Sequence, residues 1–110
     1  MVAPAASGSG SRPVHACALE VELRIPASAS LKAKRTVVRH LLDTARQRYG
    51  VAAGETAHQD KWQRAQLGFA AVGPDTGHVD AVLDRVERFV WSHPEVEVLS
   101  MSRSWLETSV

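Results

Sequence analysis

The chain has 110 residues, of which 45% are hydrophobic, and its formal net charge is +1. This length fits one globular domain that buries about two-thirds of its unfolded surface, enough for a hydrophobic core. Cys17 is the only cysteine of the sequence, so an internal disulfide and a thiolate-rich metal site are excluded. Because no apolar run approaches the length of a membrane span, we expect a cytoplasmic protein without a membrane partner.

The first residues differ in composition from the rest of the chain. Residues 1–13 are dominated by Ala, Ser, Gly and Pro, and Arg12 is their only charged residue. Such a segment has too little apolar surface to offset the entropy lost on ordering. We therefore expect a disordered tail over residues 1–13 and a single domain over residues 14–110.

The hydrophobic pattern predicts six elements in the order strand, helix, strand, strand, helix, strand. Their expected ranges, in chain order, are residues 17–25, 30–48, 51–56, 64–72, 76–92 and 95–101. A serine at the start of the first helix and Asp75 or Thr76 at the start of the second can act as N-caps. Gly50 and the His93-Pro94 pair are expected to end the two helices.

This order is typical of an α+β ferredoxin-like βαββαβ sandwich. Two right-handed crossovers are expected to place the first and third strands side by side and parallel, in a four-stranded mixed sheet of order 4-1-3-2. Both helices then cover one face, and the other face stays open. On that open face the two central strands present Glu20, Glu22, Gly68 and Ala70, which offer no aromatic ring for base stacking.

The first expected helix carries six cations against one acid, Asp43. The six are Lys32, Lys34, Arg35, Arg39, Arg46 and Arg48. Cations near a helix N-terminus oppose the helix dipole at a cost of about 0.3–1 kcal/mol each, which a purely structural helix would avoid. We therefore predict that nucleic-acid phosphates are bound by Lys32, Lys34, Arg35 and Arg39. An ordinary solvated helix face is the competing interpretation.

Charge is also divided along the chain. Residues 30–64 hold eight Lys/Arg and three Asp/Glu, whereas residues 65–110 hold three and seven. A positive half favours an anionic partner, and two opposite halves on one domain favour self-association.

The hairpin expected between residues 51 and 72 collects polar and aromatic side chains. Glu55, His58 and Asp60 form a weak alternative polar site, and without a second histidine or a thiolate we expect no metal or other cofactor there. Trp62, followed by Arg64, is a better candidate to stack on a base or to anchor a partner. The competing interpretation is that Trp62 covers the edge of the core.

The fourth strand contains candidate interface residues. If Val96 and Val98 face the helices, then Leu99, Met101 and Trp105 line an apolar strip at the outer edge of the sheet. Such a strip favours a homodimer. If the parity is reversed, the strip belongs to the core.

Three motifs follow one another along the chain. They are Leu23-Arg24-Ile25-Pro26, Ser30-Leu31-Lys32-Ala33-Lys34-Arg35 and Gln59-Asp60-Lys61-Trp62-Gln63-Arg64-Ala65. Over residues 15–107 the chain thereby resembles the YlxP-like family of bacterial domain-of-unknown-function proteins. The resemblance implies a small ferredoxin-like protein of the bacterial cytoplasm, often encoded beside translation-initiation and ribosome-maturation factors, with no activity established for the family.

No complete catalytic constellation is found, since Cys17 lies on the apolar side of its strand and the histidines are scattered. We therefore expect a non-enzymatic accessory protein of translation or ribosome maturation. Its expected partner is structured RNA, ribosomal RNA above all, or the ribosome, bound through phosphate contacts. The alternative is a self-associating protein–protein interaction module without nucleic-acid binding.

Overall fold

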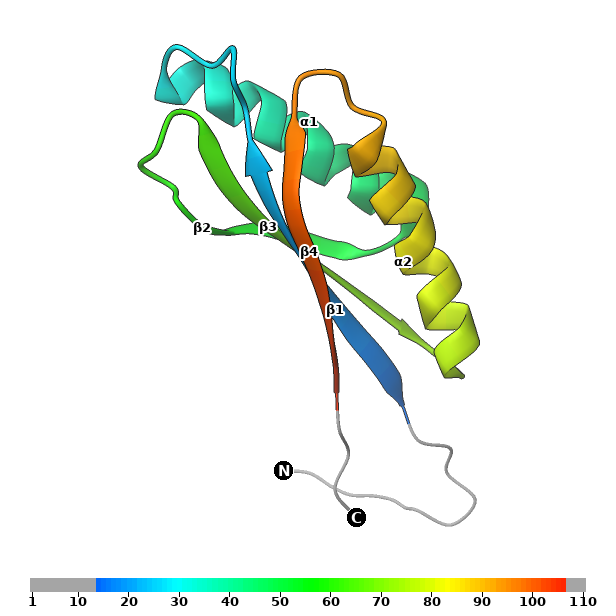
Figure 1. Ribbon diagram of the computed structural model, residues 1–110. Helices are drawn as coiled ribbons and strands as arrows, with labels where there is room; N and C mark the ends of the chain where they lie inside the picture. Colours follow the sequence, from blue (N-terminus) through cyan, green and yellow to red (C-terminus); the bar gives the residue numbers. More distant parts are fainter. Residues whose placement is uncertain (1–13, 107–110) are drawn as a thin grey trace, which may run out of the picture.

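The computed structural model of the protein describes residues 14–106 and contains the six expected elements in the expected order (Figure 1). The strands are β1 (His15–Arg24), β2 (Ala52–Ala57), β3 (Arg64–Gly73) and β4 (Glu97–Trp105), and the helices are α1 (Leu31–Tyr49) and α2 (Thr76–Trp91). The fourth strand is longer than expected and includes Trp105. The tail predicted over residues 1–13 lies outside the described residues.

The four strands form one sheet in the order β2-β3-β1-β4, which reads 4-1-3-2 when counted from the other edge. Every pair of neighbouring strands is antiparallel. The prediction of a mixed sheet with β1 parallel to β3 is therefore wrong. The helical crossovers join β1 to β2 and β3 to β4, which are not neighbours, and the β2–β3 hairpin reverses the chain so that β3 runs against β1.

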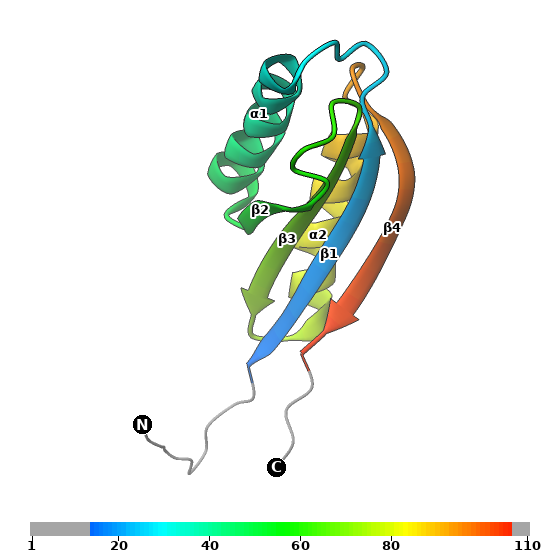
Figure 2. The ribbon, with the colours of Figure 1, turned by 90° about the vertical axis from the view of Figure 1, so that its left-hand side faces the viewer.

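Both helices lie on the same side of the sheet (Figure 2). The alternating apolar residues of β1 and β3 point toward them and are almost completely buried; these are Cys17, Leu19, Val21, Leu23, Ala65, Leu67, Phe69 and Ala71. They pack with the apolar stripes of the helices, which include Val38, Leu41, Leu42, Ala45, Val79, Leu83, Val86 and Val90. Complete burial of one Leu or Phe side chain is worth about 1.5–3 kcal/mol, so this layer supplies most of the favourable free energy. Neither described helix is apolar enough over its length to cross a bilayer.

The expected helix caps are confirmed. Ser30 is the N-cap of α1, and its Oγ accepts a hydrogen bond from the Ala33 amide at 3.0 Å. Gly50 ends α1 with φ of 68°, a left-handed conformation that favours glycine. Asp75 caps α2 by accepting from the His78 amide at 2.8 Å.

A bulge in the pairing of β4 with β1 changes which residues of β4 face the helices. Val98 is paired with Leu23 and Ser100 with Glu22, so Leu99 is an extra residue between them. As a result both Val98 and Met101 pack against the core. The predicted continuous strip of Leu99, Met101 and Trp105 is therefore wrong for Met101. Leu99 and Trp105 remain exposed, at 46% and 37%.

Candidate functional site

The three sequence motifs meet at one end of the molecule. The Ile25 amide donates to the Gln63 carbonyl at 2.9 Å, and the Gln63 side chain donates to the carbonyls of Pro26 and Ser28, each at 3.2 Å. Strand β1, the loop before α1 and the β2–β3 hairpin are thus joined there, beside the start of α1 (Figure 1). These intramolecular hydrogen bonds give a structural reason for the residues found in the first and third motifs.

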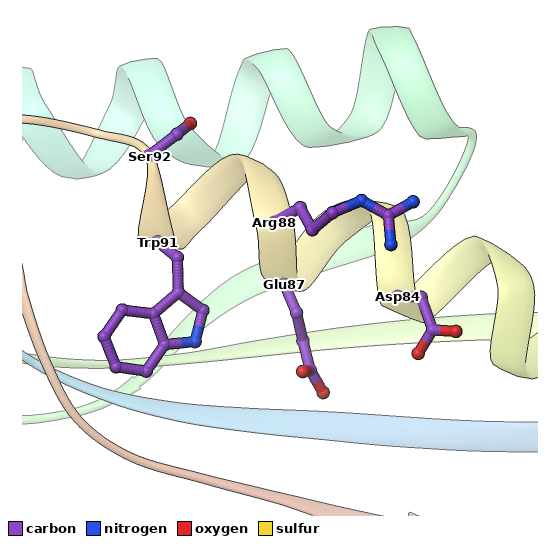
Figure 3. A pocket seen from close by; sticks show the side chains of 5 residues that line it. All are labelled: Asp84, Glu87, Arg88, Trp91 and Ser92. Atoms are coloured by element: carbon purple, nitrogen blue, oxygen red, sulfur yellow. The ribbon is translucent and has the colours of Figure 1, made fainter.

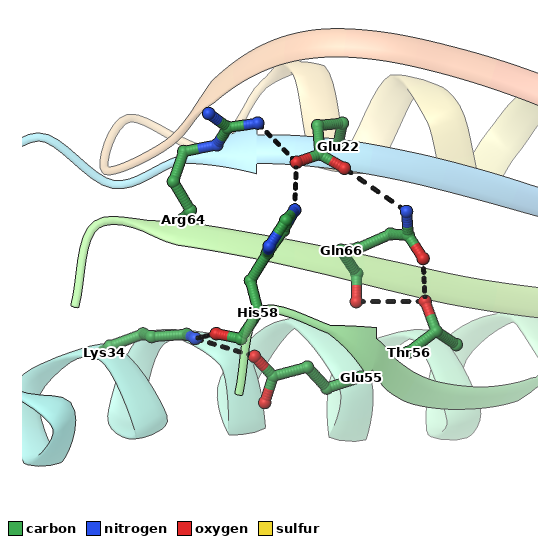
Figure 4. A network of polar contacts seen from close by, with 7 residues as sticks. All are labelled: Glu22, Lys34, Glu55, Thr56, His58, Arg64 and Gln66. Carbon is green, nitrogen blue, oxygen red and sulfur yellow. Dashed lines mark hydrogen bonds and ion pairs between the residues drawn. The ribbon is translucent and has the colours of Figure 1, made fainter. Parts of the chain in front are cut away.

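Lys34 is fully buried, which contradicts its predicted role in binding phosphate. Its Nζ lies 2.8 Å from Glu55 Oε2 on β2 and also donates to the carbonyl of His58 (Figure 4). Glu55 Oε2 has no partner of hydrogen-bond geometry, so the attraction between the two charges is mainly coulombic. The physical reason is helical periodicity, because Lys34 precedes Val38 and Leu41 by four and seven residues and shares their buried face. That spacing was visible in the sequence.

Glu22 organises a second cluster, on the open face of the sheet (Figure 4). Its Oε2 accepts from Arg64 Nη2 at 2.5 Å and lies 2.7 Å from His58 Nε2, while Oε1 accepts from the Gln66 amide at 3.4 Å. Burial alone would raise the pKa of the Glu22 carboxyl, but the hydrogen bonds from Arg64, Gln66 and His58 outweigh it and leave the pKa below its ordinary value. Arg64, which was predicted to add a nucleic-acid contact beside Trp62, is thus already paired with a carboxylate.

The weak alternative site of Glu55, His58 and Asp60 is not assembled in the structure. Glu55 is paired with Lys34, the His58 ring faces Glu22, and Asp60 is exposed in the loop. Within residues 14–106 no three His, Cys, Asp or Glu side chains gather in a position to hold a metal ion. The predicted grouping followed from closeness in sequence, whereas Glu55 and His58 contact different partners and Asp60 is exposed.

Three of the four predicted phosphate ligands on α1 remain available. Lys32, Arg35 and Arg39 are exposed, and none of them forms an ion pair with any residue between 14 and 106. Their spacing of three and four residues places them on one side of the helix, away from the core. By contrast, Arg46 is paired with Asp43 at 2.9 Å and donates to the carbonyl of Ala53.

Trp62 lies in the β2–β3 connection and is 55% exposed. It is absent from the hydrophobic core and from the residues packed against the core. The interpretation that this side chain merely covers the edge of the core is therefore disfavoured, and its indole is available to a partner.

The largest ionic cluster of the described residues was missed by the sequence analysis. Arg103 of β4 pairs with Asp80, Asp84 and Glu87 of α2, at 2.5, 2.8 and 2.8 Å. Burial alone would lower the pKa of the Arg103 guanidinium, but the hydrogen bonds to Asp84, Glu87 and Asp80 raise it. The spacing of the three acids on one side of α2 was a visible signal, but their partner depends on the position of β4. Part of the acidic half of the chain is thereby neutralised internally.

Comparison with known proteins places the motifs in a family. The family described as "Protein of unknown function (DUF503)" matches residues 16–103. The protein named "Uncharacterized protein YlxP" of Bacillus subtilis (strain 168) is 35% identical over 86 residues, which cover 78% of this chain and 94% of that protein. The family match spans nearly all of the described secondary structure.

Proposed function

The chain belongs to the DUF503 family, as its resemblance predicted, and we propose that it is a non-enzymatic RNA-binding accessory of translation or ribosome maturation. The observation that carries the proposal is the row of cations on α1, Lys32, Arg35 and Arg39, which form no ion pair with any residue between 14 and 106. A row of cations on one helix side recognises phosphates without reading bases. The surface therefore suits the backbone of a structured RNA.

Trp62 supports the same proposal from the neighbouring hairpin. Its exposed indole belongs to the β2–β3 connection, a segment that lies at the end of the sheet where α1 begins (Figure 1). A base stacked on an aromatic side chain contributes about 1–3 kcal/mol and tolerates any sequence. Trp62 would thus add a stacked, unpaired base to the phosphate contacts of the helix.

The state of the chemically active groups favours a binding role over catalysis. Cys17 is buried in the core, and burial raises the pKa of its thiol, which disfavours the nucleophilic thiolate. Glu22 and Glu55 are engaged in the ion pairs described above, and the His58 ring faces Glu22. These groups stabilise the hairpin end of the sheet and leave recognition to the exposed cations.

The proposal is tested by RNA binding at several salt concentrations. Each phosphate contact with single-stranded RNA contributes about −0.7 to the slope of log K against log salt, so three to four contacts give about −2 to −3. Replacing Lys32→Gln, Arg35→Gln and Arg39→Gln together should weaken binding and reduce the slope by about 2. Fluorescence anisotropy with a labelled RNA hairpin and a labelled single strand measures both quantities.

A matched control is Arg24→Gln, which removes an exposed arginine of β1 that pairs with Glu97 at 4.0 Å. It should leave affinity and slope nearly unchanged. Affinity that is independent of salt, or equal losses in the triple variant and in Arg24→Gln, would contradict the proposal.

A second candidate function, self-association, is favoured by an apolar patch at the opposite end of the sheet. Val72 and Leu106 are 65% and 58% exposed and flank Ala16 of β1, to which the Leu106 amide donates at 2.9 Å. A groove of about 310 Å³ beside them is lined by Trp105 and Ala18 among others. Sedimentation equilibrium of the unmodified chain and of a Val72→Asp variant tests this candidate. The unmodified chain should form a dimer, and the variant should be monomeric.

A further inference from the structure

A groove between the end of α1 and one side of α2 gathers three arginines. Arg48 comes from α1, and Arg85 and Arg88 come from α2. The groove has a volume of about 370 Å³, and Tyr49 and Phe89 contribute to its walls. Neither the sequence motifs nor the proposed RNA contacts involve these residues.

None of the three guanidinium groups forms an ion pair with any side chain of residues 14–106. The acids of α2 that could neutralise them are directed elsewhere, since Asp84 and Glu87 are bound by Arg103. Figure 3 shows Arg88 leaving α2 in a different direction from those two carboxylates. Arg103 therefore draws the acids of α2 toward β4, and the arginines of α2 have no counter-charge from residues 14–106.

Arg48 is held in place by aromatic contacts. Its guanidinium carbon lies 5.7 Å from the centre of the Phe89 ring and 6.0 Å from that of Tyr49, and the two rings are 6.0 Å apart. A guanidinium within about 6 Å of an aromatic ring is attracted by it. The cation is thus oriented before any ligand arrives.

A structural role at the helix ends explains only part of the cluster. Arg48 and Arg88 lie in the last turns of their helices, where the helix dipole favours cations, but Arg85 precedes the last turn of α2. Each helix C-terminus contributes about half a negative charge, so two ends leave about two of the three positive charges uncompensated. Guanidinium groups that line one groove repel one another, and a multiply charged anion would relieve that repulsion.

We propose that this groove binds a phosphate group, in which Arg85 and Arg88 donate to the phosphate oxygens and Arg48 completes the positive environment. The planar fork of arginine matches two phosphate oxygens at once. The phosphate belongs to a small phosphorylated ligand or to a nucleic-acid backbone. Arg48 follows Arg39 by nine residues, two and a half helical turns, so the groove lies on the other side of α1 from the row of Lys32, Arg35 and Arg39. The proposal therefore stands independently of the proposed RNA contacts.

The test is a titration of the full chain with pyrophosphate, followed by ¹H–¹⁵N NMR. Saturable shifts are expected at the amides of residues 48–49 and 85–92. The pair Arg85→Gln with Arg88→Gln should weaken binding by about tenfold or more, because both charge-assisted donors are lost. The matched control, Arg24→Gln with Lys61→Gln, removes the same charge at exposed positions outside the groove and should change the affinity by less than about twofold.

The same spectra show that each variant keeps its fold, and Arg48→Gln gives an independent test if the double variant does not. A second titration, with a short RNA lacking terminal phosphates, identifies the source of the phosphate. Groove shifts with both probes indicate a nucleic-acid backbone, and groove shifts with pyrophosphate alone indicate a small phosphorylated ligand. Absence of saturable groove shifts with pyrophosphate at millimolar concentration overturns the proposal, as do equal losses in the two double variants.

Discussion

Lys34 is the only charged residue among positions 14–106 that the fold buries, so its replacement gives a sharp test of the site geometry. In Lys34→Met the apolar stem of the side chain is kept, but the charge opposite Glu55 and the donor to the His58 carbonyl are lost. The Glu55 side chain is only 18% exposed, and water therefore replaces the lost ammonium poorly. Removing one partner of a buried ion pair typically costs about 3–5 kcal/mol.

For a domain of this size 1 kcal/mol corresponds to about 4–8 °C, so the expected fall in Tm is about 12 °C or more. Chemical unfolding in urea, followed by circular dichroism, measures the free energy of unfolding directly. Lys32→Met is the matched control, because Lys32 is exposed two residues earlier on the same helix and should change stability by no more than about 0.5 kcal/mol.

The double variant Lys34→Met with Glu55→Met removes both charges and should be more stable than Lys34→Met alone. Replacing both members of a buried pair by apolar side chains is often nearly neutral, whereas leaving one charge behind is not. A loss below about 1 kcal/mol in Lys34→Met would refute the buried ion pair, as would strictly additive effects of the two substitutions.

Three further predictions concern other parts of the molecule. Arg103→Met should lower the free energy of unfolding by about 1–2 kcal/mol in urea, a modest loss because its carboxylate partners are partly exposed, while Arg85→Met should be nearly neutral. Because the pKa of Glu22 is lowered in the folded chain, its ionised carboxylate stabilises the fold at pH values above the ordinary pKa of glutamate. This contribution is lost as the pH falls from about 5 toward 3. Glu22→Gln should therefore show a smaller acid-induced loss of stability than the unmodified chain, and Glu20→Gln, two residues away on the exposed part of the same face, should not; equal pH profiles would contradict the cluster. Trp62→Ala should leave Tm unchanged within about 2 °C because the side chain is mostly exposed, but should weaken RNA binding by about 1 kcal/mol or more.

Local patterns predicted the secondary structure well because their causes are local. The period-two alternation of Leu19, Val21 and Leu23 defines the buried side of β1, and the oxygen of Ser30 reaches an amide only three residues away. The direction of β3 was a different matter. The prediction placed β1 and β3 side by side correctly but gave β3 the wrong direction: the crossover leaves β2 parallel to β1, and the β2–β3 hairpin then reverses β3.

The residues of the candidate site likewise divide into those that local patterns predicted and those that they did not. The sequence correctly indicated that Lys32, Arg35 and Arg39 occupy the outer side of α1, since charged residues away from the apolar stripe face water. It also brought Lys34 into that group, although the four-residue spacing to Val38 already placed Lys34 on the buried side. The position of Met101 could not be deduced from alternation, because a bulge shifts the register within β4.

By itself, the sequence determined the elements, their caps, the family and the concentration of cations on α1. The tertiary structure decided which of those charges are free. Lys34 meets Glu55, Arg64 meets Glu22 and Arg103 meets the acids of α2, in each case across a long stretch of chain. The periodicity of an element shows which side of it a residue occupies. Coulombic pairing depends instead on distances of a few ångströms between segments, and those distances exist only after the sheet and helices have packed.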